Sequence, residues 1–151
     1  MIETPEIVET SPQMMAFIHL TIPREDIRHV MDPGLQEILG VLADQGIEPA
    51  GPWFTHHLRM APETFDFEIC VPVPVKGKLS RRVEFGEWPA MTVARTIYAG
   101  PYGGLGRAWK EFSEWIAASG HTPEEDLWER YMSSPPAAAR TELNRPLKLP
   151  R

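Results

Sequence analysis

The segment LWERYM, residues 127–132, contains the residue with the clearest chemical potential in the chain, Glu129. Side chains of a strand alternate between two faces, so Glu129 and Tyr131 share one face while Trp128 and Arg130 share the other. We expect the bulkier face, with Trp128, to pack on a helix, which turns Glu129 toward a cleft. A carboxylate desolvated among aromatic groups has a raised pKa unless a cation pairs with it. Such a group can anchor a lipophilic cation or act as a general acid or base.

Glu129 and Tyr131 each have a structural interpretation as well. Glu129 is alternatively a solvated strand charge or the ion-pair partner of an arginine, for which Arg59, Arg95 and Arg130 are the candidates. Tyr131 either stacks on or hydrogen-bonds to a flat ligand, or it packs in the core. The pattern favours the binding-site interpretation for Glu129 and leaves both interpretations open for Tyr131.

A glycine-rich segment, TIYAGPYGGLGRAW over residues 96–109, resembles a phosphate-binding turn at first sight. Phosphate loops need Lys-Ser/Thr after the glycines or a G-x-G-x-x-G turn in a parallel β-α-β unit, and neither is present. We therefore predict a tight turn from a strand into a helix. Tyr102 in this turn either points into the cleft or packs over the turn. Tyr98 and Trp88 are weaker ligand-binding candidates, and packing at the rim of the cleft is the better interpretation for both.

The two halves of the chain resemble each other at an offset of 74 residues. Residues 35–73 align with residues 109–147 without a gap, and four of the seven identical positions are glycine or proline. Because these residue types fix turn geometry, their placement indicates a structural duplication. Upstream of the helices, residues 12–14 match residues 89–91 at an offset of 77.

Each half predicts the same order of elements: a strand, a helix and a two-stranded hairpin. The expected strands and hairpins cover residues 14–22, 53–60 and 64–73 in the first half, and 91–98, 126–132 and 139–147 in the second, with an edge strand near 83–85. Asp32 and Pro33 predict the start of the first helix, and Gly46 and Gly120 predict left-handed caps where the helices end. The stripe Trp109, Phe112, Trp115 and Ile116 has the spacing of a buried helix face.

These elements predict an α+β fold: a tandem β-α-β-β duplication with pseudo-twofold symmetry, antiparallel sheets and a central cleft. We expect a single domain over residues 1–151, made of two halves of about 1–75 and 76–151. A cleft between two such halves is a common place for a small-molecule site.

The duplication suggests two further site residues, His57 and Glu142. At the offset of 74, Glu129 corresponds to Thr55 and Tyr131 to His57, so His57 either faces the same cleft or is a surface histidine. Glu142 faces the cleft or solvent; beside Glu129 it would suit acid–base chemistry, because adjacent carboxylates split their pKa values. The five histidines show no ligand spacing with carboxylates, so we expect no metal site and no cofactor.

Composition narrows the classes of partner. The net charge of −6 and the absence of a basic stripe argue against direct nucleic-acid binding. Cys70, the single cysteine, lies in an apolar run and is expected to be a buried thiol. With neither a signal core nor a membrane-spanning stretch, the sequence predicts a cytoplasmic protein that does not contact membranes. The expected partner is a small molecule, hydrophobic or cationic, and the oligomeric state is left open.

Several motifs of the second half together resemble the GyrI-like small-molecule-binding domain, which is also the effector-binding domain of multidrug-responsive transcription activators. They are the segment Tyr98–Tyr102, then Leu105 and Trp109, Trp115-Ile116, Trp128–Tyr131, and Thr141–Leu143 followed by Pro146. The resemblance covers nearly the whole chain and implies two β-α-β-β units with a cleft between them. It also implies that Glu129 is a buried acid in contact with the ligand.

The resemblance implies two functions of different classes. The first is a sensor or sequestering domain for amphipathic, aromatic or cationic compounds. The second is a hydrolase of strained cyclopropane-bearing toxins, with Glu129 and Tyr131 as general acid and base, helped by His57 or Glu142. A gyrase-binding or other protein-interaction role is a third possibility. In the activators this domain follows a DNA-binding helix-turn-helix region. Such a DNA-binding region has at least ~50 residues, whereas only about a dozen residues precede the first expected strand here. We therefore expect a stand-alone domain.

Overall fold

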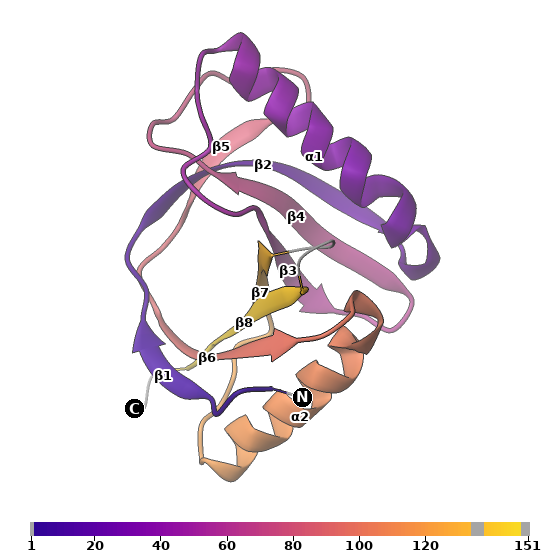
Figure 1. Ribbon diagram of the computed structural model, residues 1–151, viewed down its shortest axis with the longest axis vertical. Helices are drawn as coiled ribbons and strands as arrows, with labels where there is room; N and C mark the ends of the chain where they lie inside the picture. The colour runs from indigo at the N-terminus through magenta and orange to yellow at the C-terminus, as the bar shows by residue number, and fades with distance from the viewer. Residues whose placement is uncertain (1, 134–137, 149–151) are drawn as a thin grey trace.

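The computed structural model describes residues 2–133 and 138–148. Its strands are β1 (Glu6–Glu9), β2 (Gln13–Pro23), β3 (Phe54–Met60), β4 (Thr64–Pro72), β5 (Glu84–Trp88), β6 (Thr92–Ala99), β7 (Leu127–Ser133) and β8 (Arg140–Pro146). The helices are α1 (Ile27–Asp44) and α2 (Leu105–Ala118), preceded by the short 3-10 turns Arg24–Asp26 and Tyr102–Gly104. The predicted α+β class and the order strand, helix, hairpin in each half are confirmed (Figure 1).

The eight strands form one antiparallel sheet in the order β1-β6-β8-β7-β3-β4-β2-β5. The expectation of separate sheets was wrong, because β3 pairs with β7 and so joins the two halves. The predicted edge strand is β5, which pairs with β2, and the other edge is β1, which pairs with β6. Each half of the chain therefore contributes an edge strand to the strands of the other half.

The register along the middle of the sheet agrees with the offset of 74 residues. Thr55 of β3 lies opposite Glu129 of β7, and these are the two positions that the offset matches. The upstream offset of 77 was wrong by one residue. Val71 and Arg145 are equivalent at the offset of 74, and their partners in the sheet are Ala16 of β2 and Ala94 of β6. Equivalent positions of β2 and β6 are therefore 78 residues apart. The duplication and the division into halves near residue 75 stay predictions.

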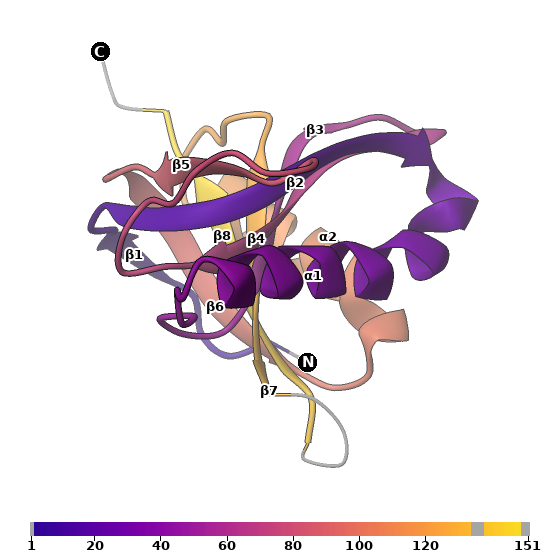
Figure 2. The same cartoon turned by 90° about the horizontal axis from the view of Figure 1, so that it is seen from above.

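Both helices cover the same face of the sheet, at different places (Figures 1 and 2). One row of directly opposed residues crosses six strands: Ile18, Ile69, Thr55, Glu129, Leu143 and Thr96. Opposed residues share a face. Ile18 and Ile69 pack in the cluster beneath α1, and Leu143 packs in the cluster beneath α2. The middle of the row, with Thr55 and Glu129, therefore lies between the helices.

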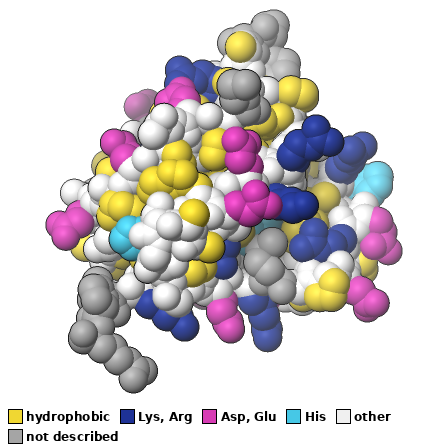
Figure 3. Space-filling model, turned by 90° about the horizontal axis from the view of Figure 1, so that it is seen from below, with side chains coloured by type: hydrophobic (Ala, Val, Ile, Leu, Met, Phe, Trp, Pro, Cys, Tyr) yellow, Lys and Arg dark blue, Asp and Glu magenta, His cyan; other side chains and the backbone are white. Residues whose placement is uncertain are grey.

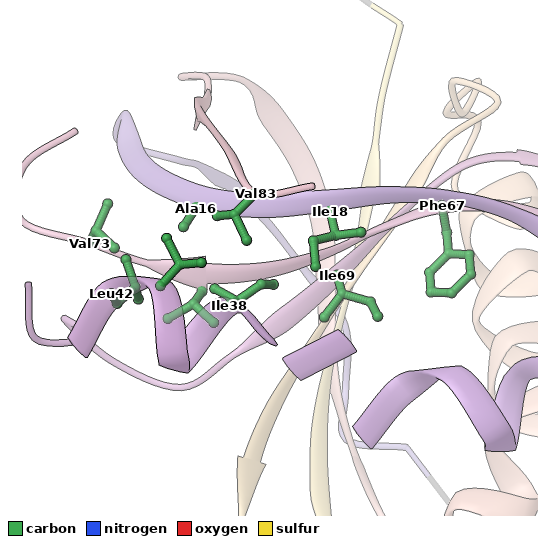
Figure 4. Close-up of a cluster of buried hydrophobic side chains, with 10 residues drawn as sticks. Ala16, Ile18, Ile38, Leu42, Phe67, Ile69, Val73 and Val83 are labelled. Atoms are coloured by element: carbon green, nitrogen blue, oxygen red, sulfur yellow. The ribbon is translucent and has the colours of Figure 1, made fainter. Parts of the chain in front are cut away.

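The core beneath α1 holds the first half together. Ile38 and Leu42 of α1 pack between the helix and β2 and β4, together with Ala16, Ile18 and Ile69 (Figure 4). Burying an aliphatic side chain of this size contributes about 1.5–3 kcal/mol. The equivalent core of the second half is built from Ala108, Phe112 and Ile116 of α2 against Ala94 and Leu143.

The helix ends were predicted better than the helix starts. Gly46 and Gly120 adopt φ angles of +69° and +80°, which confirms the left-handed caps. The predicted start at Asp32 was wrong, because α1 begins at Ile27 and contains Pro33. Ile27, Val30 and Met31 pack on the core in the extra turn, and this burial offsets the backbone hydrogen bond that proline removes.

The other face of the sheet, which carries no helix, also buries side chains. Met15, Phe54, Cys70, Trp88 and Trp128 form a third hydrophobic cluster there. The prediction that the Trp128 face packs on a helix was therefore wrong, since Trp128 packs against other strands of the curved sheet. Cys70 is fully buried, as predicted, and burial raises the pKa of its thiol.

The surface and the helices add two general observations. On the face drawn in Figure 3, acidic and basic side chains are both distributed among hydrophobic ones. Neither helix of the described part of the chain is both long and apolar enough to cross a membrane.

Candidate functional site

Glu129 lies at the centre of the sheet with its carboxylate buried and hydrogen-bonded on both oxygens. The indole Nε1–H of Trp109 on α2 donates to Oε2 at 2.6 Å, and the Tyr131 hydroxyl donates to Oε1 at 2.8 Å. The residue is 8% exposed. Both donors are neutral groups, so they orient the carboxylate without cancelling its charge.

Tyr131 extends this hydrogen-bond chain to β3. Its single hydroxyl proton goes to Glu129, so the Thr55 hydroxyl, 2.8 Å away, donates to the Tyr131 oxygen. Burial, and then the negative charge of Glu129, raise the pKa of Tyr131 well above its usual value. The ring of Trp53 packs on the ring of Tyr131, with centroids 4.3 Å apart. The chain from Thr55 through Tyr131 to Glu129 is therefore fixed at every step.

His57 lies on the same face as Glu129 and Thr55, as the offset suggested. Its ring stacks on Phe67 with centroids 5.3 Å apart and meets the edge of Phe65 at 5.4 Å. Burial lowers the pKa of His57, although the charge of Glu129 acts in the opposite direction. We therefore treat His57 as a neutral imidazole at pH 7.

Aromatic side chains from three parts of the chain contact Glu129 or its hydrogen-bond partner Tyr131. Trp53 precedes β3, Trp109 belongs to α2, and Tyr102 lies in the 3-10 turn before α2. Tyr102 is 43% exposed and points its ring edge-on to Tyr131, with centroids 6.0 Å apart. We call these three residues the aromatic rim. Glu129 and Tyr131 are both buried, so the site is closed in this structure.

The arginines considered as structural partners of Glu129 pair with other carboxylates. Arg59 binds Asp66 at 3.0 Å, and Arg95 and Arg130 lie 3.5 and 3.3 Å from Glu142. Among residues 2–133 and 138–148, no ion pair involves Glu129. The geometry therefore leaves the charge of Glu129 without a cationic partner in the described part of the chain.

Three of the predicted site residues lie away from Glu129. Trp88 and Glu142 are buried on the face without helices, because Glu142 lies opposite Arg130 in the sheet while Glu129 lies opposite Leu143. The hypothetical pair of Glu129 with Glu142 is thus not formed. Tyr98 is buried beneath α2, and its hydroxyl donates to the carbonyl of Pro101 at 2.9 Å.

The position of Tyr98 also explains part of the glycine-rich turn. A Cβ atom on Gly100 would lie 2.6 Å from the Tyr98 hydroxyl oxygen, and one on Gly104 would clash with the same atom. Both glycines let the turn close over the tyrosine. Their function is packing beneath the aromatic rim, consistent with a turn from strand to helix rather than a phosphate loop.

Sequence reasoning missed three residues of the site: Thr55, Trp53 and Trp109. Thr55 was signalled by the offset that matches it to Glu129, but only His57 was taken from that match. Trp109 has the spacing of the buried stripe on α2, and nothing in this spacing separates a core tryptophan from one that uses its N–H. The same holds for Trp53, which stands in a short loop before β3.

His56, the neighbour of His57, faces the opposite side of the sheet and bridges two carboxylates. Its Nδ1 lies 2.9 Å from Glu68 and its Nε2 lies 2.7 Å from Asp126. Burial on its own lowers the pKa of His56, but the hydrogen bonds to Asp126 and Glu68 outweigh it, and the net pKa is raised. The folded protein therefore holds the imidazolium form more strongly than the unfolded chain does.

This raised pKa predicts a pH-dependent contribution to stability. The contribution is complete below the unfolded pKa of about 6.5 and is lost as the pH rises through the folded pKa. We expect the free energy of unfolding of wild type minus that of His56→Gln to fall between pH 6 and pH 9, measured by urea denaturation. A difference that stays constant or grows over this range contradicts the imidazolium bridge. His29→Gln, at an exposed position of α1, is the matched control.

A scan against protein-family models matches residues 3–148 to the GyrI-like small-molecule-binding domain. The chain belongs to the GyrI-like family. The resemblance noted from the motifs of the second half is thereby confirmed. No curated protein sequence matches the chain.

Solved structures support the GyrI-like fold. The C-terminal domain of EcmrR matches with a TM-score of 0.83 and 21% identity, over 96% of this chain and 97% of that domain. In the cryo-EM structure of an EcmrR–DNA complex, the TM-score is 0.82 at 20% identity, and the match covers 96% of this chain but 57% of EcmrR. This GyrI-like chain therefore spans little more than half the length of that protein.

Two smaller proteins also share the fold. SAV2435, whose structure was solved bound to tetraphenylphosphonium, matches with a TM-score of 0.66 and 14% identity, over 97% of this chain and 94% of its own. A hydrolase from Listeria innocua matches with a TM-score of 0.69 and 11% identity, over 95% and 91% of the two chains. At these identities the similarity shows the fold of the GyrI-like family.

Proposed function

We propose that this GyrI-like domain binds amphipathic, aromatic or cationic small molecules beside Glu129, as a sensor or sequestering domain of the cytoplasm. The observation that carries the proposal is a buried carboxylate whose hydrogen-bond partners, Trp109 and Tyr131, are both neutral. A buried charge without a counter-charge is costly, and a cationic ligand removes that cost when it binds. The carboxylate then selects ligands by charge.

The aromatic rim supports the second part of the proposal, the preference for aromatic and apolar cations. Trp109 donates a hydrogen bond to the carboxylate directly. Trp53 and Tyr102 pack on Tyr131, which donates to the same carboxylate. Cations bind the faces of tryptophan and tyrosine rings with about 0.5–2 kcal/mol, and more strongly where water is excluded. SAV2435, which shares the fold, was solved with tetraphenylphosphonium, a cation with four phenyl groups.

Ligand entry requires the aromatic rim to open, because Glu129 is closed off in this structure. Tyr102 is the most exposed member of the rim and stands in the short turn before α2. A rotation of Tyr102 and Trp109 would give access to Glu129 without breaking the strand pairing of β3 and β7. Side-chain rearrangement of this kind is common at binding sites.

The hydrolase hypothesis has less support from the geometry. It needs an acid and a base that both reach the substrate. Glu142 lies on the opposite face, and His57 is the remaining candidate base, held between Phe65 and Phe67. We therefore favour binding over turnover.

The test compares a cation with a neutral molecule of similar shape. Calorimetric titration of the wild-type protein with tetraphenylphosphonium is expected to give at least ~10-fold tighter binding than titration with triphenylphosphine oxide. The two compounds share three phenyl groups on phosphorus and differ in charge and in the fourth phenyl group, so the same pair is also titrated into Glu129→Gln, which isolates the contribution of the charge. Equal affinity for both compounds contradicts charge selection, and binding of neither contradicts the site.

A further inference from the structure

The face of the sheet without helices carries an open, partly enclosed cavity of about 350 Å³ between the two halves of the chain. Its apolar lining includes Met15 and Phe17 of β2, together with Met91 and Trp128. This volume lies at the lower end of the range of small-molecule sites, which is about 300–1,000 Å³. The cavity is separate from the candidate site, because Trp128 and Glu129 point to opposite faces of β7.

The cavity is also lined by charged groups with an excess of negative charge. His56 shares its two ring nitrogens between Glu68 and Asp126, so one imidazolium faces two carboxylates. Glu87 adds a third carboxylate to the lining. Arg145 lies near enough to Asp126 to interact with its charge, but it does not line the cavity, and its Nε donates to the carbonyl of Glu124 at 2.9 Å.

Hydrogen-bonding capacity is left over at the same carboxylates. Glu68 accepts from His56 through Oε1, and Asp126 accepts through Oδ2. The second oxygen of each carboxylate accepts no side-chain hydrogen bond from the residues that the structure describes. Both side chains are mostly buried, with exposed fractions of 15% and 26%. These oxygens can therefore receive N–H groups from a bound molecule.

A stack of four side chains holds two residues of the cavity lining, His56 and Trp128, in place. The His56 ring lies parallel to Trp128, with centroids 3.7 Å apart, and Trp128 lies parallel to Trp88 at 4.3 Å. The guanidinium of Arg130 covers Trp88 at 4.9 Å from its centroid. A wall whose rings already pack on both sides loses little freedom when a ligand binds, and such preorganisation favours affinity.

We infer that this cavity is a second binding site, which takes a compact organic cation with N–H donors on an apolar body. The donors reach the carboxylates of Glu68 and Asp126, and the apolar body lies against Met15, Phe17 and Met91. This inference is independent of the proposed function, because it uses the other face of the sheet and different carboxylates.

The experiment uses two small probes and amide NMR spectra of the full chain. 2-Phenylethylammonium is the cation, and 2-phenylethanol is its neutral counterpart. We expect the cation to shift the amide signals of His56, Gly86, Glu87 and Met91, with binding at least ~5-fold tighter than that of the alcohol. Shifts confined to residues around Trp109 and Tyr131, or equal affinity for the two probes, overturn the inference.

Variants separate this cavity from the site at Glu129. Glu68→Gln and Asp126→Asn are each expected to weaken binding of 2-phenylethylammonium about 5-fold or more. Glu87→Gln changes an exposed lining residue and tests the charge without touching the His56 bridge. Glu129→Gln is the matched control and should leave the shifts at Gly86 and Met91 unchanged. Affinity that falls in Glu129→Gln but not in the other three variants overturns the second site.

Discussion

Glu129→Gln is expected to weaken tetraphenylphosphonium binding by about 10- to 100-fold, while binding of triphenylphosphine oxide changes little. Glutamine keeps the shape of glutamate but has no charge, and only one of its two terminal atoms accepts a hydrogen bond. In the wild-type protein, the N–H of Trp109 and the O–H of Tyr131 each donate to one carboxylate oxygen of Glu129. The variant therefore loses both the negative charge and one of these two hydrogen bonds. Calorimetric titration at pH 7 measures both affinities.

The control for this prediction is Glu111→Gln, which removes the same charge from an exposed position of α2. Its tetraphenylphosphonium affinity should equal that of the wild type within about 2-fold, because exposed charges are screened by solvent. Circular dichroism of both variants checks that the fold is kept. Unchanged cation affinity in folded Glu129→Gln would mean that Glu129 does not select the ligand.

Trp128→Ala is expected to lower the free energy of unfolding by about 3–5 kcal/mol. Trp128 is 2% exposed and packs on His56, Trp88 and Phe54, so its removal leaves a large cavity where both halves of the sheet meet. Urea denaturation measures the loss. Met132→Ala, four positions along the same segment of chain and 45% exposed, should change stability by about 0.5 kcal/mol or less. A loss below about 1 kcal/mol in Trp128→Ala would show that the stack contributes little.

The behaviour of Trp128 shows where sequence reasoning about strands succeeds and where it fails. Alternation correctly separated Glu129 and Tyr131 from Trp128 and Arg130, because side chains of a strand must alternate. It assigned the helices to the wrong face, because both faces of LWERYM carry large apolar residues. The curved sheet buries both faces, one beneath the helices and one against other strands.

Other features were beyond local patterns for similar reasons. β1 has the sequence EIVE, and it is a strand because β6 offers it an unpaired edge. The start of α1 at Ile27 depends on core contacts that outweigh the break expected at Pro33. By contrast, Gly46 and Gly120 were predicted correctly, since a left-handed cap depends on a single residue and its near neighbours.

The site itself was predicted in part. The sequence singled out Glu129, Tyr131, Tyr102 and His57, and the structure brings these four to one face of the sheet. It could not predict the hydrogen bond from Trp109 to Glu129, because the two residues belong to α2 and β7 and no local pattern relates them. Whether these residues bind a ligand stays a prediction for the experiments above.

The exchange of the edge strands β1 and β5 makes each half of the sheet depend on a strand from the other half of the chain. The N-terminal strand β1 pairs with β6, and β6 and β8 lead in turn to β7, which carries Glu129. Residues 2–10 thus support the part of the sheet that holds the carboxylate, although they are far from it in the sequence. Removing residues 6–9 therefore acts on the half of the molecule that carries Glu129, and a cut between the halves separates each half from an edge strand of its sheet.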